Sequence, residues 1–240
     1  MVLTAGGIYF AELNKIIRES GDKDIILNDV LGQRYIGCGI ADKRIEVRGT
    51  PGNALGAYMN GGVLEIFGNA QDATGDTMNN GKIIIHGNCG DTTGYGMRGG
   101  VIFVKGDAGY RVGIHMKEYR DLKPVIVIGG KAGDFLGEYQ AGGIIIVLGL
   151  NSEGRVPVGN FCGTGMHGGA IYLRTMRPPD DLPAQVNISP MTGSDINLVR
   201  KYVGEYCSLF GCDESRVMNS EFVKLTPNTK NPYRQLYTHN

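Results

Sequence analysis

The chain has 240 residues, enough for one elongated domain, and its 24 Lys and Arg residues balance its 24 Asp and Glu residues. Zero net charge gives no indication of binding to nucleic acid or an anionic membrane, and no apolar run is long enough to span a bilayer. The start lacks the basic and apolar regions of a signal peptide, and five scattered Cys without CxxC spacing favour reduced thiols, so we expect a cytoplasmic protein.

Residues 1–24 form the first of three predicted segments. Residues 10–20 have helical spacing, with Leu13, Ile16 and Ile17 on one face. We expect this helix to cap the open end of the structure that follows, because that end would otherwise expose unpaired backbone.

The second predicted segment, residues 25–175, repeats a unit of about nineteen residues. Inserts at residues 117–121 and 150–156 lengthen two of the later units. Each unit reads G-x-x-G-x-x-x-G, then Met, then Gly-Gly, then a β-branched run that predicts a strand. The strands are expected at residues 63–67, 83–86, 101–105, 125–128, 144–148 and 170–174.

The glycines of this pattern are expected at the corners of the repeat, where the backbone turns with positive φ. They are Gly49, Gly52, Gly56, Gly68, Gly75, Gly87, Gly90, Gly94, Gly106, Gly109, Gly113, Gly130, Gly133 and Gly137. A unit with one strand and so many glycines cannot bury its own apolar face, whereas stacked units can. The sequence therefore predicts an all-β fold: a single-stranded parallel β-helix of about seven coils, with a short N-terminal cap and a C-terminal helical tail.

Equivalent positions in successive units form columns of one chemical type. A methionine column is predicted in the core, at Met59, Met78, Met97, Met116 and Met166. Alternate strand positions should face outward, and in the later units they turn apolar, at Phe103, Val127, Ile146 and Tyr172. We call these four residues the outer stripe. An exposed stripe of this size is unusual, so we expect either the C-terminal segment or a partner to cover it.

The third predicted segment, residues 176–240, begins as a Pro-containing linker. Thr192-Gly193-Ser194-Asp195 predicts the start of a helix that runs to about Phe210. A short strand at residues 221–225 and a tail containing Pro and Asn are expected to follow.

No arrangement of residues predicts a catalytic, cofactor-binding or metal site in this chain. Cys207 and Cys212 fit no common zinc spacing and are expected to be packed thiols. Asp72 and Asp91 occupy the same position in adjacent units, where close carboxylates could serve a carbohydrate-active β-helix enzyme. Asn and Asp also suit turns, and a turn position is the simpler explanation.

The repeat, with its Met-x-Gly-Gly step, resembles the C-terminal GXGXG β-helix domain of the glutamate synthase large (alpha) subunit. One of the subunits of formylmethanofuran dehydrogenase shares this repeat. The domain start at residues 32–37, the Thr192-Gly193-Ser194 helix start and the run Phe222-Val223-Lys224-Leu225-Thr226-Pro227 resemble glutamate synthase more closely. The chain is therefore similar to a separately encoded form of that domain.

The resemblance implies a right-handed β-helix that is not an enzyme by itself. It implies a structural subunit of a glutamate synthase complex, which converts glutamine and 2-oxoglutarate to two glutamate. The partners would be an amidotransferase and an FMN-binding synthase, which would carry the FMN and the iron–sulfur cluster. Assembly of several copies of this chain into a homo-oligomer is a further alternative. The alternative is a protein similar to the formylmethanofuran dehydrogenase subunit that shares the repeat.

Overall fold

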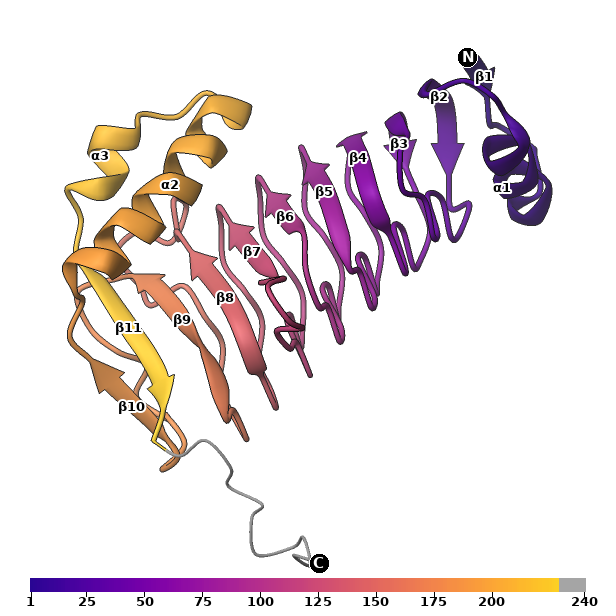
Figure 1. Cartoon of the computed structure of the whole chain (residues 1–240). Coiled ribbons are helices and arrows are strands. Elements are labelled where there is room, and N and C mark those ends of the chain that lie inside the picture. The colour runs from indigo at the N-terminus through magenta and orange to yellow at the C-terminus, as the bar shows by residue number, and fades with distance from the viewer. Residues whose placement is uncertain (229–240) are drawn as a thin grey trace, which may run out of the picture.

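The structure, a computed structural model, describes residues 1–228, and its strands lie side by side along the whole length of the molecule (Figure 1). The eleven strands form one sheet in the order β1-β2-β3-β4-β5-β6-β7-β8-β9-β11-β10. Their bounds are Val2–Thr4 (β1), Asp24–Leu31 (β2), Arg44–Thr50 (β3), Asn60–Phe67 (β4), Asn80–Ile85 (β5), Val101–Val104 (β6), Val125–Ile128 (β7), Ala141–Val147 (β8), Gly168–Arg174 (β9), Val186–Ser189 (β10) and Phe222–Pro227 (β11). The tail expected to contain Pro and Asn lies mostly outside the described residues.

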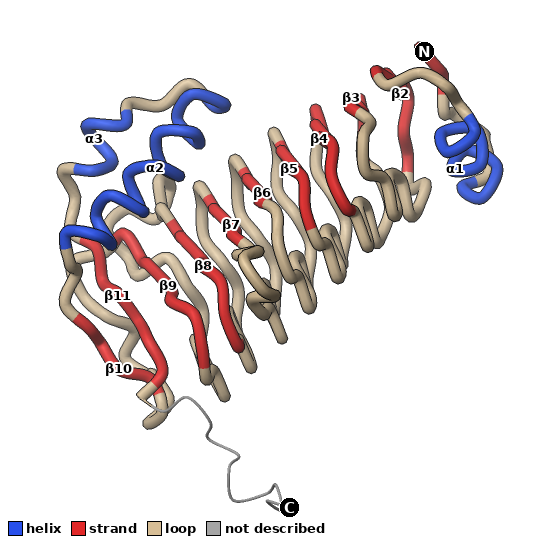
Figure 2. Tube along the Cα trace, viewed as in Figure 1, coloured by secondary structure: helices blue, strands red, loops and turns tan. Residues whose placement is uncertain are grey.

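Among the described residues, helices occupy only the two ends of the molecule, and loops return between the strands (Figure 2). α1 (Phe10–Glu19) lies at the N-terminal end, and α2 (Gly193–Phe210) and α3 (Glu214–Met218) lie at the other end. The expected helices at residues 10–20 and from Thr192 to Phe210 are therefore confirmed. Within the described residues, no helix is long and apolar enough to cross a membrane.

Strand pairing follows the repeat. Ile102 of β6 pairs with Ile126 of β7, which in turn pairs with Ile145 of β8, all in parallel register. A shift of one residue would turn each apolar column to the other face, so the matching columns fix this register. Away from the sheet, isolated parallel bridges join the loops at Ala70, Cys89, Ala108, Ala132 and Val158.

The predicted fold class, a right-handed parallel β-helix of about seven coils with a cap and a helical tail, was wrong. The described residues form one large mixed sheet, parallel from β1 to β9 and antiparallel where β11 and β10 are added. The reason is that segments outside the repeats also supply strands. β1 comes from the predicted cap and β10 from the predicted linker. β11 confirms the short strand expected at residues 221–225, but its place in this sheet was not expected. The repeat period carries no information about those segments.

Apolar side chains form two separate layers. The larger layer contains the inward-facing strand residues and the methionine column, and it runs from Leu13 in α1 to Leu225 in β11. The smaller layer lies on the other face of the later strands, between the sheet and the two C-terminal helices. The C-terminal segment is therefore part of the folded body rather than an appendage.

Candidate functional site

In several repeats the second glycine of the pattern leaves room for a polar side chain of the preceding repeat. A Cβ at Gly90 would lie 2.2 Å from Oδ1 of Asp72, and a Cβ at Gly109 would lie 2.2 Å from Oδ1 of Asp91. Oδ1 of Asp72 accepts a hydrogen bond of 2.9 Å from the backbone N–H of Asp91. Oδ1 of Asp91 accepts one of 2.8 Å from Tyr110. Both carboxylates thus tie one loop to the next, which is the turn role that their position suggested.

The same arrangement recurs on a neighbouring column of Asn and Asp. Oδ1 of Asn69 accepts from the backbone of Asn88, Asn88 accepts from that of Asp107, and Asp107 accepts from that of Lys131. A Cβ at Gly87, Gly106 or Gly130 would lie within 2.3 Å of these oxygens. At Gly49, Gly52, Gly68 and Gly133 the close neighbour is instead a backbone carbonyl of the preceding repeat.

The third glycine of each unit is required for a different reason. Gly94 has φ +72°, and a Cβ there would lie 2.4 Å from Cδ1 of Ile126 in the core. The equivalent glycines, which also have positive φ and face an isoleucine of the core, are Gly56, Gly75, Gly113 and Gly137. These positions therefore need both left-handed backbone and the absence of a side chain.

The methionine column lies in the core as expected. Its members are fully buried: Met59, Met78, Met97, Met116 and Met166. Gln140 stands between Met116 and Met166 in this column and is also fully buried. Its Nε2 donates to the carbonyls of Gly142 and Gly143, so one polar group interrupts an otherwise apolar column.

The outer stripe lies under α2. Phe103, Val127 and Ile146 are fully buried and Tyr172 is 2% exposed. They pack with α2 side chains, among them Val199, Val203 and Tyr206. Burying one valine side chain of this kind stabilises the fold by about 1.5–3 kcal/mol. Of the two covers expected for the stripe, the C-terminal segment is the one that the structure shows, so the stripe is not available as an interface.

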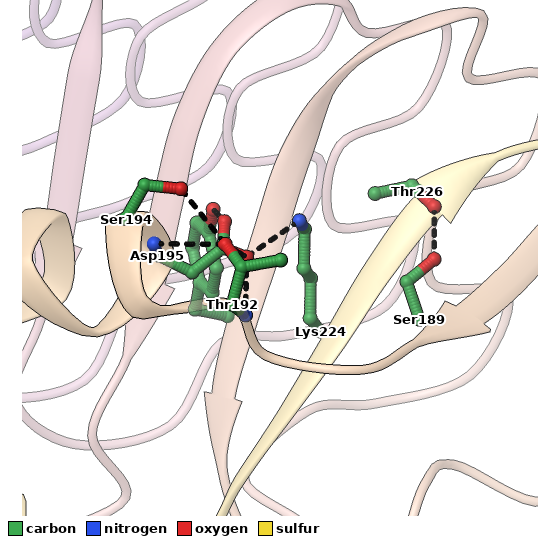
Figure 3. Close-up of polar contacts among 7 residues, drawn as sticks. Ser189, Thr192, Ser194, Asp195, Lys224 and Thr226 are labelled. Carbon is green, nitrogen blue, oxygen red and sulfur yellow. Dashed lines mark hydrogen bonds and ion pairs between the residues drawn. The ribbon is translucent and has the colours of Figure 1, made fainter.

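A cluster of polar residues anchors α2 to the sheet, and we call it the Asp195 cluster (Figure 3). Oδ2 of Asp195 accepts hydrogen bonds from Nζ of Lys224 at 2.8 Å, Oγ1 of Thr192 at 2.6 Å and the Thr192 backbone at 2.8 Å. Oδ1 accepts from the hydroxyl of Tyr172 at 2.6 Å. Thr192 and Asp195 also form a capping box at the start of α2.

The Asp195 cluster joins the two tail motifs that the sequence singled out. Thr192 and Asp195 come from the helix start, whereas Lys224 comes from β11. Nearby, the hydroxyls of Ser189 in β10 and Thr226 in β11 are 2.7 Å apart. Each motif is visible separately in the sequence, but no local pattern signals that the antiparallel strand brings them together.

The charges in this cluster suit attachment rather than proton transfer. Burial raises the pKa of Asp195, but hydrogen bonds from Lys224, Thr192 and Tyr172 outweigh burial and hold the pKa well below its usual range. Burial and the neighbouring Asp195 carboxylate raise the pKa of the Tyr172 hydroxyl. An acid that stays ionised and a phenol that stays protonated near neutral pH cannot exchange a proton readily.

The cysteines differ from the expected set of packed thiols. Cys207 at the end of α2 and Cys212 just beyond it form a disulfide, so the expectation of reduced thiols was wrong for this pair. Cys38, Cys89 and Cys162 are free. Burial raises the pKa of both Cys89 and Cys162 to about 12. Within residues 1–228, no group of three His, Cys, Asp or Glu side chains is placed to hold a metal ion.

A sheet of stacked repeats with glycine corners, closed by a helix over its apolar stripe, defines a repeat protein. The chain belongs to the GXGXG motif family, whose profile matches residues 22–229.

Two comparisons describe its relatives. The chain is 47% identical to the uncharacterized protein MJ1350 of Methanocaldococcus jannaschii over an alignment of 251 positions, which covers 99% of this chain and 96% of that protein. Its fold is similar to that of a chain in the formyltransferase/hydrolase complex (FhcABCD) of Methylorubrum extorquens, solved with methylofuran. That match has a TM-score of 0.62 and 20% identity, and it covers 85% of this chain and 73% of that chain.

Proposed function

We propose that this chain is a non-catalytic structural subunit of a multi-protein complex, in which it holds catalytic polypeptides in position. The proposal rests on one observation: the polar side chains of the repeat bind the backbone of the next loop. Asp72 and Asp91, the pair that suggested acid–base chemistry, are bonded to the backbone of the next loop. A long, regular body of this kind offers an extended surface on which partners can be arranged.

Glutamate synthase is the first candidate complex. The two tail motifs that resemble its large subunit meet in one place, the Asp195 cluster, which gives them a common structural purpose. In this assembly the partners would be an amidotransferase and a synthase that binds FMN and an iron–sulfur cluster. The chain itself would bind neither cofactor and would catalyse no step.

A complex related to formylmethanofuran chemistry is the second candidate. The similarity in fold to a chain of the FhcABCD complex supports it, and the comparisons favour this assembly over the first. In both candidates the chain has the same role, because a repeat body positions other polypeptides that carry out the chemistry.

Affinity purification of the tagged chain from its native cell tests the proposal. We expect other polypeptides to co-purify under gentle conditions. Flavin absorbance together with an amidotransferase in the eluate would identify glutamate synthase. Formyltransferase and hydrolase polypeptides, with a methanofuran-type cofactor in the cell extract, would identify the second complex. Recovery of the tagged chain alone would contradict both.

A further inference from the structure

The lengthened loop at residues 150–156, which the repeat does not explain, borders a cavity of about 500 Å³. Its other walls come from the end of β9 and from residues 219–221. A second cavity of about 360 Å³ shares Leu150 and Arg174 with the first and extends toward Cys212 and Arg216. Because the two cavities share these residues, we treat them as one site with Arg174 at its centre, and we call it the Arg174 cavity.

Arg174 is held in a fixed position by groups that carry no charge. Its Nε donates to Oγ of Ser220 at 2.9 Å, and its Nη1 donates to the carbonyl of Leu148 at 2.8 Å. The side chain is half-buried, and no carboxylate of the described residues lies within ion-pair distance of it. A guanidinium has five N–H donors, so donors remain for a ligand.

Arg216 adds a second positive charge to the same cavity. It lines the wall next to Arg174, and burial together with Arg216 lowers the pKa of the Arg174 guanidinium. Within residues 1–228, the Arg216 side chain also has no ion pair. The two like charges repel each other; Arg216 is exposed, so solvent screens part of the repulsion, and an anion between them would offset the rest.

None of the acidic residues around the cavity forms an ion pair with Arg174 or Arg216. Asp213 accepts a hydrogen bond from the Arg216 backbone as the N-cap of α3. Glu153 lies 3.7 Å from Arg155, with which it forms an exposed ion pair. Glu221 lines the cavity wall and has no ion pair among the described residues. The guanidiniums of Arg174 and Arg216 are therefore left without a negative partner.

We propose that the Arg174 cavity binds a small molecule that carries a carboxylate or phosphate group, through the guanidiniums of Arg174 and Arg216. Planar guanidinium groups match the paired oxygens of both anions, and the prior fixing of Arg174 lowers the entropy lost on binding. Ser152, Thr175 and Asn219 also line the cavity and supply neutral hydrogen-bonding groups for the rest of the ligand. This site goes beyond the structural role proposed above and does not depend on it.

Calorimetric titration of the full chain with inorganic phosphate and, separately, with malonate tests this proposal. Saturable binding of either anion is expected, and the tighter one identifies the ligand's acidic group. Arg216→Gln should weaken that binding by about tenfold or more, because it removes charge-assisted hydrogen bonds. Arg200→Gln is the matched control, since Arg200 is exposed on α2 and lies outside the cavity lining.

Arg174→Lys is a second variant, which keeps the charge but loses the planar fork, and it should also weaken binding. Thermal unfolding of each variant shows whether it is folded. The proposal is overturned if neither anion binds saturably to the wild-type chain. It is also overturned if Arg216→Gln and Arg200→Gln, both folded, weaken binding equally, since that would reflect net charge alone.

Discussion

Asp195→Asn should loosen the attachment of α2 to the sheet. Oδ2 of Asp195 is the oxygen that accepts from Lys224 and twice from Thr192. Whichever way the Asn amide is turned, one of the two acceptor oxygens becomes an NH2 group, so either the donors of Lys224 and Thr192 or the hydroxyl of Tyr172 lose their acceptor, and the charge that pairs with Lys224 is lost. Losing a partly buried ion pair and these hydrogen bonds should lower the free energy of unfolding by about 2–4 kcal/mol. The side chains of Asp195 and Lys224 are 9% and 17% exposed, so solvent screens the pair only weakly.

The effect should depend on pH with a defined sign. The folded pKa of Asp195 lies below its unfolded value, so its carboxylate stabilises the fold above about pH 4. That contribution is lost as the pH falls through the folded pKa. The difference between the wild-type chain and Asp195→Asn should therefore be full at pH 7 and shrink in acid.

Urea unfolding followed by circular dichroism, with hydrogen exchange at α2, provides the assay. Asp213→Asn is the matched control, because Asp213 is exposed, caps α3 with one hydrogen bond, and Asn caps helices about as well as Asp. The control should change stability by less than about 0.5 kcal/mol. Equal destabilisation by the two variants, or unchanged exchange in α2 of Asp195→Asn, would refute the reasoning.

Two further predictions concern the repeats. Gly109→Ala places a Cβ 2.2 Å from Oδ1 of Asp91 and should lower the free energy of unfolding in urea by about 1–3 kcal/mol. Gly193→Ala is the control and should leave stability unchanged, because a Cβ there would have no neighbouring atom within 4 Å. Equal effects of the two variants would contradict the packing argument. Cys89 and Cys162, with pKa about 12, are about one part in ten thousand thiolate at pH 8, so iodoacetamide should leave both unmodified until the chain is unfolded. Rapid alkylation of either in the native chain would show that its loop opens.

The repeat allowed much of the fold to be predicted, because the residues of one column all point to the same side of the sheet. Ile102, Ile126 and Ile145 are paired neighbours and fully buried, as their common position required. The same reasoning failed outside the repeat. Residues 186–189 show no periodic signal, and they form a strand only because β11 pairs with them in antiparallel register.

The anchoring of the C-terminal segment shows the same limit. The apolar outer stripe predicted that something must cover it, but not which segment. Lys224 reaches Asp195 across 29 positions in sequence, and Arg174 reaches Ser220 across 46. Such contacts depend on the path of the chain, which local patterns do not encode. The Arg174 cavity was missed for this reason, although the lengthened loop beside it was visible as a break in the repeat.

The central claim is that this chain holds other polypeptides together, and the mass of the complex that contains it tests that claim most directly. Light scattering coupled to size-exclusion chromatography, applied to the tagged chain from its native cell, measures that mass. We predict a complex well above the 25.8 kDa of one chain, with at least one different polypeptide confirmed by peptide mass spectrometry. Elution at 25.8 kDa, or at a multiple of it with no other polypeptide present, would contradict the account.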